Sequence, residues 1–280
     1  MKLPYYEVAA FSKNPFGGNP AGVCPLPKWL PDETLLRIAA NNNLAETAFF
    51  VPRGDDHELR WFTPTVEIDL CGHATLAAAF VLFTELGCKG DAVRFHSRSG
   101  MLSVAKAGNT LVLDFPSCPP APTTTLEALI RALGATPKEV LKARDYFVVF
   151  SDEAVVQTLK PDFAVLKRLD CLGVIATAPG GDCDFVSRFF APGIGVDEDP
   201  VTGSTHCSLI PFWAEKLGKD KLFARQISSR GGELYCEHAG SRVKIGGHSV
   251  MYLRGEILLP DTDGPTTMAQ RTGGPSKDFE

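Results

Sequence analysis

The stretch NNNLAETAFF (41–50) contains an acid that could transfer a proton. Glu46 lies in it between apolar residues. An acid in an apolar setting is expected to hold its proton more tightly than in water, which suits proton exchange near neutral pH. The alternative is a solvated glutamate at the start of a strand, and the residues themselves favour neither interpretation.

A second stretch, CGHATLAAAFVLFTELG (71–87), places Gly72 and His73 directly before an apolar run. A helix that begins here would present unpaired N–H groups and partial positive charge, which together favour an anion. A histidine at this position is also common as a capping or core residue. The pattern therefore indicates an anion site only if the helix end faces a ligand.

A third stretch, EDPVTGSTH (198–206), precedes another apolar segment and carries Asp199, Thr202, Gly203 and Ser204. Taken singly, Ser204 is typical of a helix N-cap and Asp199 of an acid that stabilises a helix N-terminus. The chain has no GxSxG motif for a nucleophilic serine. Glycines before both helices would let a ligand approach the backbone closely.

Metal and nucleotide motifs are missing from the sequence. Cys71, His73, Asp199 and His206 do not show the HxH or HExxH spacing of metal ligands. The segment GGNP (17–20) matches neither GxGxxG nor a P-loop. We therefore expect no metal and no organic cofactor.

The composition is that of a soluble globular protein. The 280 residues are 44% hydrophobic and 22% charged, and the net charge of −5 argues against nucleic-acid binding. No apolar run reaches the ~18–20 residues of a membrane span. The start, MKLPYYEVAAF, does not resemble a signal peptide, and the eight cysteines form no CxxC pair. We expect reduced thiols and a cytoplasmic location.

The chain repeats itself in three blocks that occur in the same order. Arg60–Pro64 recurs as Arg188–Pro192, at an offset of 128 residues. Gly72–Thr75 recurs as Gly203–His206, at an offset of 131. Residues 97–113 match residues 229–245, at an offset of 132. Agreement of this kind predicts two homologous halves.

Each half is predicted to contain a strand, a glycine-rich turn, an apolar helix and a hairpin. The helices are expected over 74–86 and 204–217, and the first is apolar on every side, so it should be surrounded by sheet. The predicted fold class is α+β, with two pseudo-symmetric domains that each wrap a mixed sheet or barrel around a central helix. The predicted ranges are an N-terminal half 1–117, a proline-rich linker 118–125, a C-terminal half 126–259 and a flexible tail 260–280. The site is expected in the cleft between the halves.

Four motifs together resemble those of the PhzF, or phenazine biosynthesis-like, family. They are GGNPAGV (17–23), NLAETAF (43–49), RWFTP with CGHATLA (60–77) and RFFAPGIGVDEDPVTGSTH (188–206). The resemblance covers about residues 3 to 258, and it implies the diaminopimelate epimerase fold and catalysis without a cofactor. It also implies a small carboxylate-containing substrate and, as is common in the family, a homodimer.

The resemblance assigns roles to the candidate residues. Glu46 corresponds to the family's general acid/base, and His73 and Asp199 to further catalytic groups. The substrate-binding positions would be Asn19, Gly72, Thr202, Gly203 and Ser204.

One departure separates the chain from the related two-base epimerases, which need a cysteine before each helix. Cys71 holds the first of these positions, but Thr202 holds the second. A threonine hydroxyl ionises far less readily than a thiol, whose pKa is ~8.5, so this pair argues against two-base racemisation. The favoured hypothesis is an isomerase with one base, Glu46, and with Cys71 as a packing residue. The alternative is a protein that binds a metabolite without catalysis.

Overall fold

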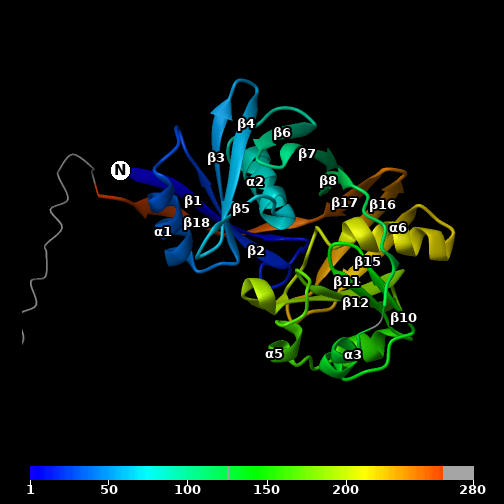
Figure 1. Cartoon of the computed structure of the whole chain (residues 1–280). Helices are drawn as coiled ribbons and strands as arrows, with labels where there is room; N and C mark the ends of the chain where they lie inside the picture. Colours follow the sequence, from blue (N-terminus) through cyan, green and yellow to red (C-terminus); the bar gives the residue numbers. More distant parts are fainter. Residues whose placement is uncertain (125, 261–280) are drawn as a thin grey trace, which may run out of the picture.

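The computed structural model describes residues 1–124 and 126–260, so the predicted tail lies, apart from Pro260, outside the described residues. Figure 1 shows the two halves side by side, the first in blue and cyan and the second mainly in green and yellow. The elements of the first half are β1 (Lys2–Ala10), β2 (Asn19–Pro25), α1 (Asp32–Asn42), β3 (Glu46–Arg53), β4 (Asp56–Phe62), β5 (Glu67–Ile68), α2 (Gly72–Thr84), β6 (Ala92–Ser97), β7 (Gly100–Ala107) and β8 (Thr110–Pro116).

The remaining elements build the second half and a last strand. They are β9 (Ala121–Pro122), α3 (Glu127–Leu133), β10 (Glu139–Lys142), β11 (Tyr146–Val149), α4 (Glu153–Thr158), α5 (Phe163–Leu166), β12 (Val174–Pro179), β13 (Phe185–Ala191), the 3-10 helix η1 (Pro192–Ile194), β14 (Val196–Asp199), α6 (His206–Leu217), β15 (Lys221–Gln226), β16 (Gly232–Ala239), β17 (Arg242–Gly247) and β18 (Ser249–Leu258).

The two halves share one pattern of strand pairing. In the first, β1 pairs antiparallel with β2, β2 parallel with β3, β3 antiparallel with β4 and β4 parallel with β6, followed by the antiparallel pairs β6–β7 and β7–β8. In the second, β10, β11, β12, β13, β15, β16 and β17 repeat this sequence of pairings in the same order. The antiparallel pair β8–β17 joins the halves. The predicted α+β architecture with two pseudo-symmetric halves is confirmed.

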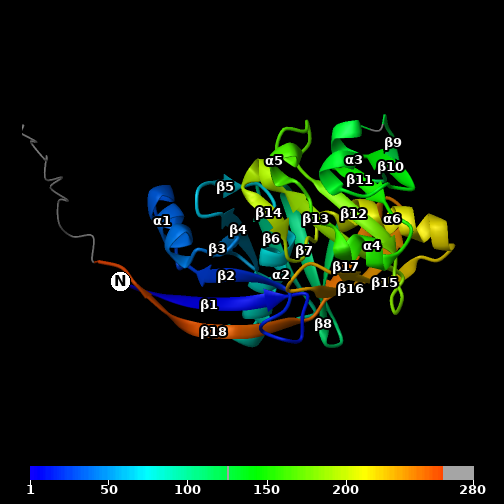
Figure 2. The same ribbon diagram turned by 90° about the horizontal axis from the view of Figure 1, so that it is seen from below.

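Each half also receives a strand that follows the last strand of the other half. After β8 the chain crosses and β9 pairs with β10, and after β17 it crosses back and β18 pairs with β1. Figure 2 shows β18 running alongside β1. The domain ranges 1–117 and 126–259 remain a prediction. The strand pairing shows in addition that Ser249–Leu258 contributes to the sheet of the first half.

The central helix of the first half is buried because it is apolar on every side. Gly72 to Ala79, Val81 and Leu82 are all buried, and α2 packs against β1, β2, β3, β7, β8 and β18. A helix surrounded in this way has no polar face to present to water. In the second half, α6 packs against β15, β16 and β17. The observed helices begin and end within two residues of the predicted limits.

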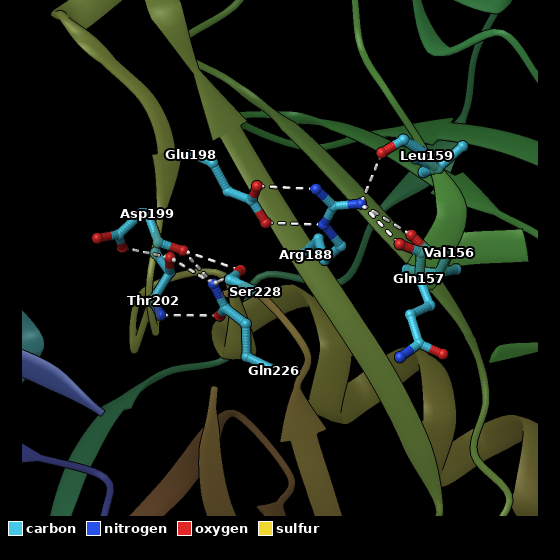
Figure 3. Close-up of polar contacts among 9 residues, drawn as sticks. All are labelled: Val156, Gln157, Leu159, Arg188, Glu198, Asp199, Thr202, Gln226 and Ser228. Atoms are coloured by element: carbon cyan, nitrogen blue, oxygen red, sulfur yellow. Dashed lines mark hydrogen bonds and ion pairs between the residues drawn. The ribbon is translucent and has the colours of Figure 1, made fainter. Parts of the chain in front are cut away.

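The strand before each helix is held by the same ion pair. Arg60 donates to both oxygens of Glu67, at 2.7 and 2.8 Å, and Arg188 donates to both oxygens of Glu198 at the same two distances. Figure 3 shows the second pair, in which Arg188 also reaches backbone carbonyls of the α4 segment. Paired, charge-assisted hydrogen bonds of this geometry fix direction as well as distance. They position the segments that lead into the two helix heads.

His206, the first residue of α6, is expected to make the free energy of unfolding depend on pH. Its ring is fully buried and its Nδ1 donates to the Thr202 carbonyl at 2.9 Å. Burial lowers the pKa of His206 to about 4, although the hydrogen bond to Thr202 acts in the opposite direction. In the unfolded chain the pKa of a histidine is about 6.5, so the unfolded state binds an extra proton between these two values.

We therefore expect the contribution of neutral His206 to the free energy of unfolding to be complete above pH 6.5. It should be lost as the pH falls toward 4, and the total loss should be about 3 kcal/mol. Urea unfolding of the wild type and His206→Asn between pH 4 and 7.5 measures it, because an asparagine amide keeps a donor for Thr202. The free-energy gap between the two proteins should narrow as the pH falls. Parallel pH curves for the two proteins would rule out this role of His206.

Candidate active site

The heads of the two central helices face each other at their glycines. A Cβ added at Gly72 would lie 3.6 Å from the Cα of Gly203, and one added at Gly203 would lie 3.7 Å from the Cα of Gly72. The first N–H groups of a helix have no acceptor within the helix. The backbone at the start of α2 and the turn that leads into α6 therefore come together between the halves.

Glu46 and His73 form a close pair beside the head of α2. Glu46 begins β3, and its Oε2 lies 3.2 Å from Nε2 of His73. The side chains are only 16% and 6% exposed, so both groups are shielded from bulk water. The Sγ of Cys71 lies 3.5 Å from Nδ1 of the same ring. An acid and an imidazole in contact are suited to holding and passing a proton.

Asp199 lies at the end of β14 and is held by residues from both halves. Asn19, from β2, donates to its Oδ1 at 2.8 Å, and the Thr202 hydroxyl donates to its Oδ2. Asn19 also donates to the carbonyl of Val201 at 2.9 Å. The amide of Asn19 and the hydroxyl of Thr202 are thus used within the protein, and both position Asp199.

The charges of the two halves act on one another. Burial favours the neutral form of His73, but Cys71 and Glu46 favour the imidazolium and together raise the pKa of His73 well above its usual value. Burial raises the pKa of Asp199 to about 6, while His73 and the hydrogen bond from Thr202 act to lower it. A negative charge on Glu46 raises the pKa of Asp199 further. The three groups therefore form one electrostatic unit.

Gln226, at the end of β15, was not foreseen from the sequence. Figure 3 shows how it clamps the segment from Asp199 to Thr202. Its Oε1 accepts from the Thr202 N–H at 2.8 Å, and its Nε2 donates to the Asp199 carbonyl at 2.7 Å. A polar residue within a strand carries no motif, but its 1% exposure shows that it is structural.

A second group that was not foreseen lies beside Ser204. Arg144 donates through Nη2 to the Ser204 hydroxyl at 3.3 Å and to Asp145 at 2.8 Å. The side chain of Arg144 is 46% exposed and that of Asp145 is 5% exposed. Arg144 thus brings a permanent positive charge next to the head of α6.

Three further polar residues near the helix heads lie outside this arrangement. Glu67 is the partner of Arg60 and also of Arg98, and the Asp69 side chain is 75% exposed. His206 is enclosed in the core next to Phe185. The grooves of about 700 and 650 Å³ on the described surface are not lined by any of the candidate site residues.

The shared strand pairing defines which residues are equivalent in the two halves. Thr47 pairs with Phe62, and Val174 pairs with Phe190, the counterpart of Phe62 in the repeat. The residue before Val174 is Gly173, so Gly173 is the counterpart of Glu46.

The same comparison covers the two helix heads. Cys71 and His73 correspond to Thr202 and Ser204. The acid, thiol and imidazole of the first half are thus replaced by a glycine and two hydroxyls in the second.

No helix among residues 1–124 and 126–260 is both long and apolar enough to cross a membrane.

Known proteins match this chain over nearly its whole length. The family model described as phenazine biosynthesis-like protein matches residues 8–255. An uncharacterized isomerase of Pseudomonas aeruginosa is 52% identical, over 92% of this chain and 100% of the relative. A crystal structure of a PhzF-family phenazine biosynthesis protein from Enterococcus faecalis superposes with a TM-score of 0.91 at 48% identity, over 92% of this chain and 100% of that one.

A more distant structure shows the fold alone. A hydroxyproline epimerase from Agrobacterium vitis has a TM-score of 0.59 at 12% identity, over 93% of this chain and 94% of the other. The epimerase-like fold expected from the sequence is confirmed. With the family model and these relatives, the two-half fold identifies the chain as a member of the phenazine biosynthesis-like family and an enzyme of the isomerase class.

Proposed function

We propose that the protein is a cofactor-independent isomerase that moves a proton within a small carboxylate-containing substrate. Glu46 is the single general acid/base, and the substrate lies between the two helix heads. The observation that carries the proposal is the contact of 3.2 Å between Glu46 and His73, together with a glycine at the position equivalent to Glu46.

In the proposed reaction the Glu46 carboxylate removes a proton from a carbon alpha or vinylogous to the substrate carboxylate. The electron pair of the broken C–H bond passes into the conjugated acid, giving an enolate-like anion. The N–H groups at Gly72 and Gly203 stabilise this anion. Protonated Glu46, after exchanging its proton with solvent in part of the turnovers, then protonates a second carbon of the same conjugated system, and the enzyme is regenerated.

Other site residues support this chemistry in different ways. The imidazole of His73 holds Glu46 in place and balances its charge. Asp199, positioned by Asn19 and Thr202, forms the opposite wall, and its buried carboxyl favours a substrate group that can donate a hydrogen bond. Ser204 and Arg144 recognise the substrate carboxylate, because arginine is suited to anions of this shape.

A single base is also favoured by what the second half lacks. Thr202 stands where a two-base epimerase would have its second cysteine, and its hydroxyl already donates to Asp199. Asp145 is the buried acid that precedes β11, and Gly173 precedes the paired strand β12. One oxygen of Asp145 accepts two hydrogen bonds from Arg144. These groups suit binding better than proton removal.

The proposal extends to location and assembly. All eight cysteines are free, which supports a reducing, cytoplasmic environment. The homodimer rests on the family resemblance.

Wash-in of solvent deuterium tests the proposed function. The protein is incubated in D₂O with dihydro-aromatic and unsaturated amino acids, and deuterium in the substrate is followed by NMR. We expect exchange at a carbon alpha or vinylogous to the carboxylate of at least one compound. Binding of a compound with neither exchange nor isomerisation would instead support the alternative, a metabolite-binding protein without catalysis.

A further inference from the structure

Three side chains that can ligate a metal meet beside the head of α2. One donor atom each from Glu46, Cys71 and His73 lies within 4.8 Å of the other two. Nε2 of His73 is 3.2 Å from Oε2 of Glu46 and 4.0 Å from Sγ of Cys71. Proton transfer by Glu46 and His73 gives no role to the thiol, so the cluster holds one more donor than the proposed reaction uses.

Two of these atoms, Nε2 of His73 and Oε2 of Glu46, already have the spacing of a zinc site. With Zn–N and Zn–O distances of about 2.0–2.1 Å, a Zn–S distance of about 2.3 Å and tetrahedral angles, N and O lie about 3.3 Å apart and N and S about 3.6 Å apart. The observed N–O separation of 3.2 Å fits without adjustment. The Sγ of Cys71 lies 4.0 Å from Nε2 but only 3.5 Å from Nδ1, beside the ring and not in front of Nε2, so the thiol must turn to another rotamer to reach an ion bound at Nε2.

The donor types agree with the geometry. A thiolate, an imidazole and a carboxylate are the ligands of zinc and of the softer cadmium ion. The fourth position would be filled by water or by a carboxylate oxygen of the ligand in the cleft. In the second half the equivalent positions hold Gly173, Thr202 and Ser204, which offer no such set.

We propose that Glu46, Cys71 and His73 bind one zinc ion and that this zinc inhibits the enzyme. On binding, the Cys71 thiol releases its proton to solvent, and any proton held between Glu46 and His73 is released as well, so the ion replaces protons and no electrons are transferred. The metal then occupies the lone pairs with which Glu46 and His73 would handle the substrate proton. The inhibitory part of the proposal rests on the proposed function, and the binding part does not.

Cadmium is the direct probe of the thiol ligand. The reduced protein is titrated with Cd²⁺ while the ultraviolet cadmium–thiolate charge-transfer band is recorded, and Zn²⁺ affinity is measured by calorimetry. We expect one site per chain in the wild type. Loss of a second-sphere group costs a metal site 10–100-fold in affinity, so loss of the ligand in Cys71→Ser should weaken zinc by at least about 100-fold and remove the band.

Cys118→Ser is the matched control, because Cys118 is exposed and far from this cluster in the sequence. It should bind zinc and cadmium like the wild type. A Cys71→Ser variant that keeps the wild-type affinity and band would overturn the site.

Inhibition is read as the ratio of the deuterium-exchange rates without and with one equivalent of zinc. This ratio should be large for the wild type and for Cys118→Ser, and close to one for Cys71→Ser. An equal ratio in all three proteins would overturn the inhibitory role. Metal binding that depends on Cys71 in a protein that exchanges no compound would uphold the metal site and contradict the proposed function instead.

Discussion

Replacing Glu46 by glutamine is expected to slow substrate proton exchange by about 10²–10⁴-fold, the usual contribution of a general acid/base. The amide cannot accept the substrate proton at neutral pH, but it has the size of the carboxylate and its oxygen still faces His73. The fold should be retained, since Glu46 starts a strand whose backbone pairing does not depend on its side chain. Exchange rates from NMR in D₂O and thermal unfolding measure the two effects.

Glu58→Gln provides a control for the change from carboxylate to amide. Glu58 lies on the adjacent strand β4, is 40% exposed and accepts a hydrogen bond from Trp29 at 2.8 Å, which a glutamine oxygen can still accept. The Glu58→Gln variant should exchange the substrate proton at the wild-type rate. If Glu46→Gln also exchanged at the wild-type rate, Glu46 would not be the base.

Replacing Gly173 by alanine is expected to destabilise the protein by about 3 kcal/mol, at the upper end of the overpacking range. A Cβ at this position would lie 2.9 Å from the backbone oxygen of Phe190, and the ring of Phe189 lies closer still. Backbone atoms cannot rotate out of the way as the end of a flexible side chain can. The counterpart of Glu46 therefore cannot carry any side chain without rearrangement of β13.

Gly193→Ala is the matched control for this substitution. Gly193 is in the same half, its φ is not in the positive region, and nothing lies within 4 Å of an added Cβ. The free energy of unfolding of the Gly193→Ala variant should differ from that of the wild type by less than about 1 kcal/mol. Urea unfolding of the two variants makes the comparison, and equal stabilities would show that the site around Gly173 can expand.

The halves and the helix heads could be predicted because they leave a local record in the sequence. Gly72 and Gly203 occupy matching places in a repeat, and an apolar run of this length predicts a buried helix whatever surrounds it. The same alignment places Thr202 opposite Cys71, so the absence of a second thiol can be predicted from the sequence. Helix limits were off by at most two residues, because propensity determines helix ends less sharply than hydrophobicity determines the interior.

Contacts between distant segments could not be predicted. Asn19 and Asp199 are far apart in the sequence, and their hydrogen bond exists only because β2 and β14 meet between the halves. Gln226 and Arg144 lie outside the sequence motifs. The crossing of β9 and β18 into the opposite halves depends on how both sheets close. The equivalence of Gly173 and Glu46 also required the strand register, because the sequence around Gly173 does not resemble NLAETAF.

The stereochemical course of proton transfer tests the single-base account most directly. A substrate found by deuterium wash-in is prepared with a stereospecific label at the donor carbon and converted in D₂O, and NMR assigns the face of loss and the face of delivery. We predict that the proton leaves and deuterium arrives on the same face, because Glu46 performs both steps. Delivery to the opposite face would contradict the account and would require a second acid, for which Asp145, buried beside Arg144, would be the residue to examine.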